Sequence, residues 1–227
     1  MCMGLRPSAK YETTWERVAK AVRDHVHGSR QYETFQSLTA ILLLTYALRN
    51  ADCHAKNLAL LYTSQTDAYL APAYDFLTTS VYGGYQNNPP GISFMGKKTW
   101  LPGKNLLTFI TSTFGIPQRE QKEIVERISD VVSDTAPLVR EMMGKHPGFT
   151  DTGKRMLATW SEGIIRLRER RIFGLPAWSS PEAFHGMSDP SPLESPVTVL
   201  GRSQLLANRS RRRGKPKGNR HKPKSPA

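Results

Sequence analysis

The chain of 227 residues has little cysteine and only short apolar runs. Its two cysteines, Cys2 and Cys53, form no CxxC pair, which excludes a disulfide-stapled mini-protein and makes the fold depend on its apolar core. Purely apolar runs such as residues 40–44 are far shorter than the roughly 18 to 20 residues that a membrane-spanning helix needs. The first ten residues lack the apolar stretch of a secretory signal. We therefore expect a cytoplasmic protein with no membrane segment.

Acidic residues are absent from the carboxy-terminal tail. Residues 201–227 contain ten Lys or Arg and no Asp or Glu, so the preceding residues carry only +3 of the net charge of +13. A tail of this kind can bind nucleic acid non-specifically through phosphates, or it can simply be a solubilising disordered end. It contains no aromatic residue that would stack on bases. Any nucleic-acid contact is therefore expected to be non-specific.

The apolar spacing predicts a mainly helical domain over residues 1–173. Helical periodicity covers five segments, of which the second is apolar on all sides and is expected to be the buried central helix. These segments are residues 11–27, 32–48, 106–114, 118–143 and 153–170. Gly28 is expected to end the first helix, Pro137 to break or kink the fourth, and Asp151 to cap the fifth.

The remaining segments read as a hairpin, a loop and a linker. Residues 58–62 and 69–71 are strand-like and flank a polar turn, which predicts a β-hairpin. Residues 82–103 are rich in Gly, Pro and Asn and predict a long loop. Residues 174–200 are rich in Pro and Ser, which is typical of a linker. This linker would lead to the basic tail, which we expect to be disordered.

One stretch combines the residue types that phosphoryl transfer requires. Asp52 follows the most apolar helix, Asn57 comes five residues later, and Asp75 with Phe76 follows the hairpin. Phosphoryl transfer needs a carboxylate to meet the substrate hydroxyl, and an amide and a second carboxylate to hold magnesium on the phosphates. Protein kinases have the same five-residue separation between Asp and Asn, followed by a hairpin and an Asp-Phe-Gly element. In this chain Leu77 replaces the glycine of that element. The ordered set therefore predicts a kinase-type site.

Each of these residues also has a purely structural interpretation. Asp52 could cap a turn, Asn57 could form an Asx turn, and Asp75 could end a strand. A structural loop, however, has no need of an acid directly after its most apolar helix. We therefore favour the functional interpretation and keep the structural one open.

The same stretch resembles the HipA-like serine/threonine kinases of bacterial toxin–antitoxin systems. Residues 49–57, Arg-Asn-Ala-Asp-Cys-His-Ala-Lys-Asn, are similar to that family's Gly-Asn-x-Asp-x-His-x-Lys-Asn loop. Residues 70–75, Leu-Ala-Pro-Ala-Tyr-Asp, are similar to its Leu-x-Pro-x-Tyr-Asp metal element, and residues 92–98 resemble the strand that follows. The likeness extends from about residue 10 to residue 170. It departs from the family at Arg49, where glycine is usual.

The resemblance implies a fold and a set of roles. The fold would be a kinase-like carboxy-terminal lobe, a helical bundle with a small hairpin at the active site, using ATP and magnesium. Asp52 would be the catalytic base, and Asn57 and Asp75 would be magnesium ligands. His54 lies where many kinases have a phosphate-facing lysine, so it would either contact the transferred phosphoryl group or fix the loop by a hydrogen bond. Lys56 would either touch phosphate or be solvated.

The sequence before Asp52 does not supply the other lobe of a kinase. These residues contain no glycine-rich phosphate loop, no Val-Ala-x-Lys strand and no helix glutamate to pair with it. We therefore expect a truncated or split kinase with weak ATP binding on its own. The resemblance implies a protein substrate, such as an aminoacyl-tRNA synthetase, and a DNA-binding antitoxin as partner. The alternative is an inactive remnant that docks to an antitoxin or to a separately encoded lobe.

Overall fold

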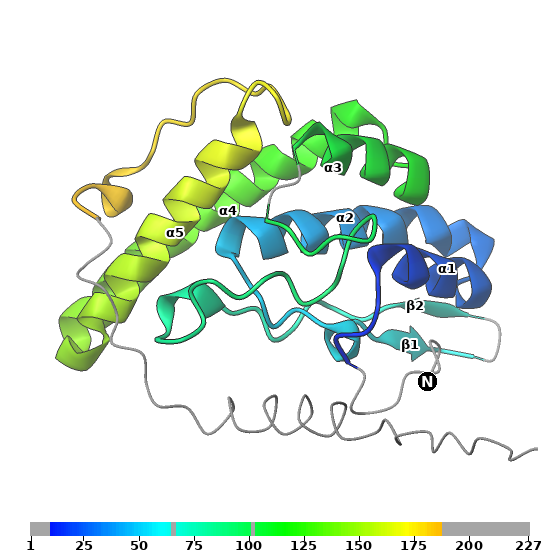
Figure 1. The fold of residues 1–227 in the computed structure, drawn as a ribbon, viewed down its shortest axis with the longest axis horizontal. Coiled ribbons are helices and arrows are strands. Elements are labelled where there is room, and N and C mark those ends of the chain that lie inside the picture. The colour runs from blue at the N-terminus through cyan, green and yellow to red at the C-terminus, as the bar shows by residue number, and fades with distance from the viewer. Residues whose placement is uncertain (1–9, 65–66, 101–102, 188–227) are drawn as a thin grey trace, which may run out of the picture. The chain divides into compact units, whose positions relative to one another are not determined.

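The structure, a computed structural model, describes residues 10–64, 67–100 and 103–187. The chain divides into two compact units, 1–193 and 194–227, and the described residues all belong to the first. Their main elements are shown in Figure 1: α1 Trp15–His25, α2 Gly28–Leu48, β1 Leu60–Tyr62, β2 Ala68–Leu70, α3 Lys104–Phe109, α4 Gln118–Lys145 and α5 Thr150–Arg168. The prediction of a mainly helical domain is confirmed. Within the described ranges, no helix has the length and apolarity that crossing a membrane requires.

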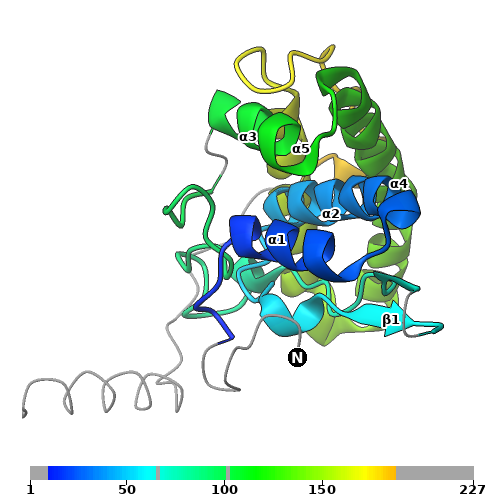
Figure 2. The ribbon, with the colours of Figure 1, turned by 90° about the vertical axis from the view of Figure 1, so that its right-hand side faces the viewer.

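The central element is α2, as its uniformly apolar sequence predicts. Leu38, Leu42 and Leu43 are completely buried on it, and burial of each such side chain contributes about 1.5 to 3 kcal/mol. The helix packs against α1, α4, α5 and β2. The hairpin lies on one side of α2 and α3 on the other in both views (Figures 1 and 2). This packing anchors the carboxy-terminal end of α2, where the candidate site begins.

The predicted hairpin forms with short strands. Leu60 pairs with Leu70, Leu61 with Tyr69 and Tyr62 with Ala68 in an antiparallel register. Each strand has three residues. The hairpin therefore brings the segment after β2 back beside the segment before β1.

Two helix ends differ from the predictions. Gly28 begins α2 instead of ending α1, because α1 already stops at His25 and Val26 is extended and buried. At its other end α1 begins at Trp15, because the Thr14 hydroxyl accepts the N–H of Arg17 as an N-cap. The residues just before Thr14 are thus free of the helix and can approach the candidate site.

The predicted break at Pro137 does not occur, because α4 continues through it to Lys145, and the alternative, a kink, stays a prediction. A proline inside a helix costs about 3 kcal/mol, and tertiary contacts on both sides offset this cost. Ala136 and Val139 are buried in the core. Arg140 donates to the carbonyl oxygens of three residues, Glu182, Ala183 and His185.

The prediction that Asp151 caps the last helix is also wrong. The α5 helix begins at Thr150, so Asp151 lies within its first turn. A negative charge there still interacts favourably with the helix dipole.

The first part of the predicted linker is packed against the domain. Phe184 is buried, and its ring packs edge-on against that of Trp178 at 5.1 Å. The α4 helix holds this segment through Arg140. The rest of the predicted linker, 188–200, and the basic tail, 201–227, lie outside the described residues, so these two assignments stay predictions.

Candidate functional site

The candidate site begins where α2 ends in a left-handed residue. Arg49 has φ 51° and ψ 49°, and its N–H donates to carbonyl oxygens of the last turn of α2. The Thr79 hydroxyl donates to the carbonyl oxygen of Arg49 at 2.9 Å and accepts the N–H of Ala51 at 2.8 Å. This one side chain therefore pins the loop that carries Asp52. Sequence reasoning missed Thr79, which is 30 residues away from Arg49.

Asn50 links the loop that carries Asp52 to the segment that carries Asp75. Its side chain is 1% exposed. The amide oxygen accepts the N–H of Asp52 at 3.1 Å, and the amide nitrogen donates to the carbonyl oxygen of Asp75 at 3.5 Å. Because both partners are backbone groups, Asn50 fixes the relative positions of the two acidic residues. The sequence signal that could have identified this role of Asn50 was its position between Arg49 and Asp52 in the loop that resembles the family.

The two predicted magnesium ligands touch. Asn57 Nδ2 donates to Asp75 Oδ2 at 2.8 Å, although 18 residues separate them in the chain. Covalent geometry then places the Asn57 amide oxygen within about 5 Å of that carboxylate oxygen. The same amide oxygen accepts the N–H of His54 at 2.8 Å, so Asn57 also stabilises the loop. The structure thus brings Asn57 and Asp75 together, while their metal role stays a prediction.

Asp75 has an unusual backbone conformation. Its φ is 58°, in the left-handed region that non-glycine residues seldom adopt. Such a residue costs on the order of 1 kcal/mol, and residues of this kind cluster at functional sites. Two hydrogen bonds hold Asp75 in this conformation. The Asn50 amide donates to its carbonyl oxygen, and the Asn57 amide donates to its carboxylate.

Three groups converge on one oxygen of Asp52, the predicted base. The Tyr11 hydroxyl donates a hydrogen bond to Oδ1. The Lys10 Nζ lies 3.7 Å from the same oxygen, and the His54 Nε2 lies 4.0 Å from it. Burial and the bond to Asp52 raise the pKa of Tyr11 well above its usual range, which keeps the hydroxyl protonated. Sequence reasoning assigned no role to Lys10 or Tyr11, although the family likeness begins at these two residues.

His54 is buried beside Asp52. It is 7% exposed, and its ring packs edge-on against the Tyr11 ring at 5.3 Å. Burial, followed by the positive charge of Lys10, lowers the pKa of His54. The hydrogen bond that fixes the loop comes from its backbone N–H, whereas within the described residues the buried ring atom Nδ1 has no partner. This lowering favours the neutral form of the ring, which lies beside Asp52.

Lys56 points outward from the loop. The residue is exposed, and its carbonyl oxygen accepts a hydrogen bond from the Tyr74 hydroxyl. The structure brings Asp52, His54, Asn57 and Asp75 together. It gives Lys56 no side-chain contact with them among the described residues.

The long loop after the hairpin closes over the site loop at Gly91. A Cβ atom at Gly91 would lie 2.2 Å from the carbonyl oxygen of Cys53 and 2.9 Å from that of Ala51. Only glycine fits at this distance. Cys53 itself is buried, and burial raises the pKa of its thiol to about 11.

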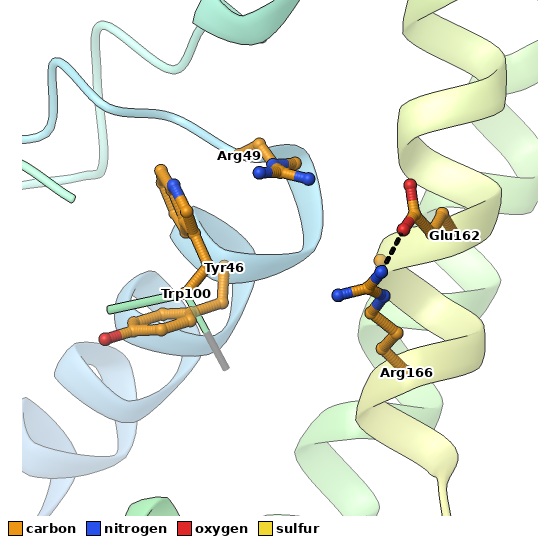
Figure 3. Close-up of a pocket in the computed structure, with 6 residues that line it drawn as sticks. Tyr46, Arg49, Trp100, Glu162 and Arg166 are labelled. Carbon is orange, nitrogen blue, oxygen red and sulfur yellow. Dashed lines mark ion pairs between the residues drawn. The ribbon is translucent and has the colours of Figure 1, made fainter. Parts of the chain in front are cut away.

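Arg49, where the family usually has glycine, faces a small pocket between α2 and α5 (Figure 3). Its guanidinium lies 5.7 Å from the centre of the Trp100 ring. Across the pocket, Arg166 pairs with Glu162 at 2.5 Å. The Arg49 side chain thus contacts the long loop.

The donor set suits a hard cation. In the described part of the chain, no group of three or more His, Cys, Asp or Glu side chains could hold a metal ion. Asn57 and Asp75 offer one amide oxygen and one carboxylate. Magnesium is commonly bound in this way, through one or two carboxylates together with waters and substrate phosphates. The residues present therefore fit magnesium.

Comparison with known proteins places the site in a family. A curated protein of Haemophilus influenzae named "Putative kinase" is 32% identical to the chain over 71 residues, which are 30% of the chain and 20% of that protein. The match therefore spans about a fifth of this relative's length. The family model described as "HipA-like C-terminal domain" matches residues 1–136, which include all the candidate site residues. Because this match covers more than half of the sequence, the chain belongs to the family of HipA-like C-terminal domains.

Proposed function

We propose that this chain carries the catalytic residues of a HipA-like serine/threonine kinase, which transfers the terminal phosphoryl group of ATP to a protein hydroxyl. The observation that carries the proposal is the 2.8 Å contact between Asp75, which follows the hairpin, and Asn57, which lies on the same short loop as Asp52. Family membership and the name of the Haemophilus influenzae relative support a kinase. The identity of the protein substrate, an aminoacyl-tRNA synthetase in the family's pattern, belongs to the proposal.

In this mechanism Asp52 accepts the proton of the acceptor hydroxyl as its oxygen attacks the terminal phosphorus, the bond from that phosphorus to the bridging oxygen breaks, and ADP leaves. The Tyr11 hydroxyl and the Asn50 amide hold the carboxylate and its backbone in place for this step. Asn57 and Asp75 would hold magnesium through their side-chain oxygens. When bound, magnesium neutralises the charge on the nucleotide phosphates.

The proposal also requires a nucleotide-covering lobe. Between residue 10 and Asp52, the described residues form α1 and α2 and contain no glycine-rich phosphate loop. We propose that such a lobe comes from another part of the same protein or from another chain, as in a split kinase. The 227-residue chain tested alone should then bind ATP weakly and transfer little phosphate.

Three variants test the proposal. Magnesium uptake would be followed by calorimetry, and phosphoryl transfer from labelled ATP would be measured with the amino-terminal half of a HipA-like relative added. Asp75→Asn and Asn57→Ala should lose magnesium uptake. Asp52→Asn should keep magnesium uptake but lose transfer by roughly 10² to 10⁴-fold, which is the contribution of a general base. Asp130→Asn, at an exposed position on α4, is the matched control and should behave like the wild type.

Two results would contradict the proposal. One is a wild-type chain that takes up no magnesium even with the complementary half present. The other is strong transfer by Asp52→Asn. Magnesium uptake without any transfer would instead favour the alternative, an inactive subunit that docks to an antitoxin or partner lobe.

A further inference from the structure

A kinase site needs a positive charge close to its base, because the transferred phosphoryl group is negative. The family loop places His54 at the position where this charge is expected. The ring of His54 is only 7% exposed, however, so it offers little surface to a phosphate. A more exposed residue beside Asp52 is better placed to supply this charge.

Lys10 has the right position for this role. Its Nζ lies 3.7 Å from Asp52 Oδ1, and its side chain is 32% exposed, so the ammonium group is both near the base and open to a ligand. The ammonium also lies 4.7 Å from the centre of the Tyr11 ring. The backbone is fixed, because the carbonyl oxygen of Lys10 accepts the N–H of Ala55 at 3.2 Å.

The neighbouring lysines are less suitable. Lys98 Nζ donates to the carbonyl oxygen of Tyr11 at 3.2 Å, so its ammonium group is already bound to the backbone. Lys56 is exposed and has no side-chain contact with the site among the described residues. The ion pair of Lys10 with Asp52 is longer than a hydrogen bond, which leaves the ammonium donors of Lys10 available.

We propose that Lys10 is the phosphate-binding cation of this site, and that its ammonium group contacts the terminal phosphate of the nucleotide beside Asp52. This inference rests on the proposed function. The family loop suggests this phosphate contact for His54. We assign it to Lys10, which lies 42 positions before Asp52. The Tyr11 hydroxyl then anchors Asp52, while Lys10 turns from the carboxylate to the phosphate when the nucleotide binds.

Magnesium tripolyphosphate is the probe for this contact. The ten basic residues of the tail also attract polyphosphate, so the readout must be local. Backbone amide NMR signals of residues 52–57 in the full chain would be followed during titration at about 0.15 M salt, where exposed charges are largely screened. Lys10→Met should raise the dissociation constant at this loop by about tenfold, the effect of losing one charge-assisted contact.

The controls separate this contact from general charge and from folding. Lys10→Arg should restore binding to within about threefold, because it keeps the positive charge. Lys97→Met removes an exposed charge from the long loop and should bind as the wild type does. Amide signals from α4 and α5 should be unchanged in every variant, which shows that the fold is intact.

The outcomes distinguish this inference from the proposed function. Tripolyphosphate binding by Lys10→Met with wild-type affinity would overturn the role of Lys10. If the Asn57 amide still responded to magnesium alone, the proposed metal site would stand. A wild-type loop that responds to neither magnesium nor magnesium tripolyphosphate would overturn both.

Discussion

Asp52 shows how one side chain is fixed by groups that are far away in the sequence. Tyr11 and Lys10, more than 40 positions earlier, face its Oδ1 atom together with His54 of the same loop. The carboxylate is therefore held at one oxygen, and in the proposed mechanism Oδ2 would be the atom left to take a proton. Cys53, the residue next to Asp52, is buried.

Burial of Cys53 should make the free energy of unfolding decrease at alkaline pH. Its pKa is raised from 9.0 to about 11, first of all by burial. An acid whose pKa is raised on folding stabilises the fold below its unfolded pKa, and this contribution is lost as the pH rises through the folded pKa. Between about pH 8 and about pH 10.5, wild-type stability should fall by about 2 kcal/mol more than that of Cys53→Ala. Urea unfolding at the two pH values measures this difference, and equal losses in both proteins would refute it.

At the scale of elements, α2 and α5 approach each other closely at Gly163. A Cβ atom there would lie 2.0 Å from the carbonyl oxygen of Ala47. Since the backbone carbonyl cannot move without displacing α2, this contact requires glycine. The α4 and α5 helices are joined by an ion pair. The buried Arg168 guanidinium donates two hydrogen bonds to the Glu126 carboxylate, at 2.6 Å and 3.1 Å.

Substitution of Gly163 tests this close approach. Gly163→Ala should lower the free energy of unfolding by about 1 to 3 kcal/mol, because the added methyl group overpacks the interface. Gly144→Ala on α4 is the matched control, because a Cβ there meets no atom within 4 Å. It should be neutral or stabilise the fold by up to about 1 kcal/mol. Chemical unfolding measures both, and similar effects at the two positions would contradict the predicted contact.

At the scale of the whole molecule, positive charge is concentrated in residues 201–227. Ten Lys or Arg without an acidic residue give this tail most of the net charge of +13. Counterion release makes contacts of this kind weaken steeply with salt. The tail and the candidate site are therefore expected to act on different ligands.

Deletion of residues 201–227 tests this separation. The full chain should bind duplex DNA without sequence preference, and its affinity should fall by at least about tenfold between roughly 50 mM and 200 mM salt. The deletion variant should lose this binding and keep its magnesium uptake. Fluorescence anisotropy with two unrelated duplexes measures the affinity. Binding that survives the deletion, or that is insensitive to salt, would rule out the tail as the contact.

The sequence predicted the helices and the hairpin because their signals are local. The period of apolar residues defines α2 and α5, and the polar turn between two apolar runs defines the hairpin. The fixed spacing of Asp52 and Asn57, together with the family likeness, identified the candidate site. Helix ends were less predictable: α4 passes through Pro137, and Gly28 starts a helix, because packing outweighs local preference at both positions.

The sequence by itself determined the mainly helical fold and the set of acidic and amide residues, since spacing along the chain is enough to encode them. The tertiary structure alone decided that Lys10 and Tyr11 meet Asp52 and that Thr79 pins its loop. These contacts join residues 28 to 42 positions apart. No local pattern encodes such a contact, because it exists only once helices and hairpin have packed around α2.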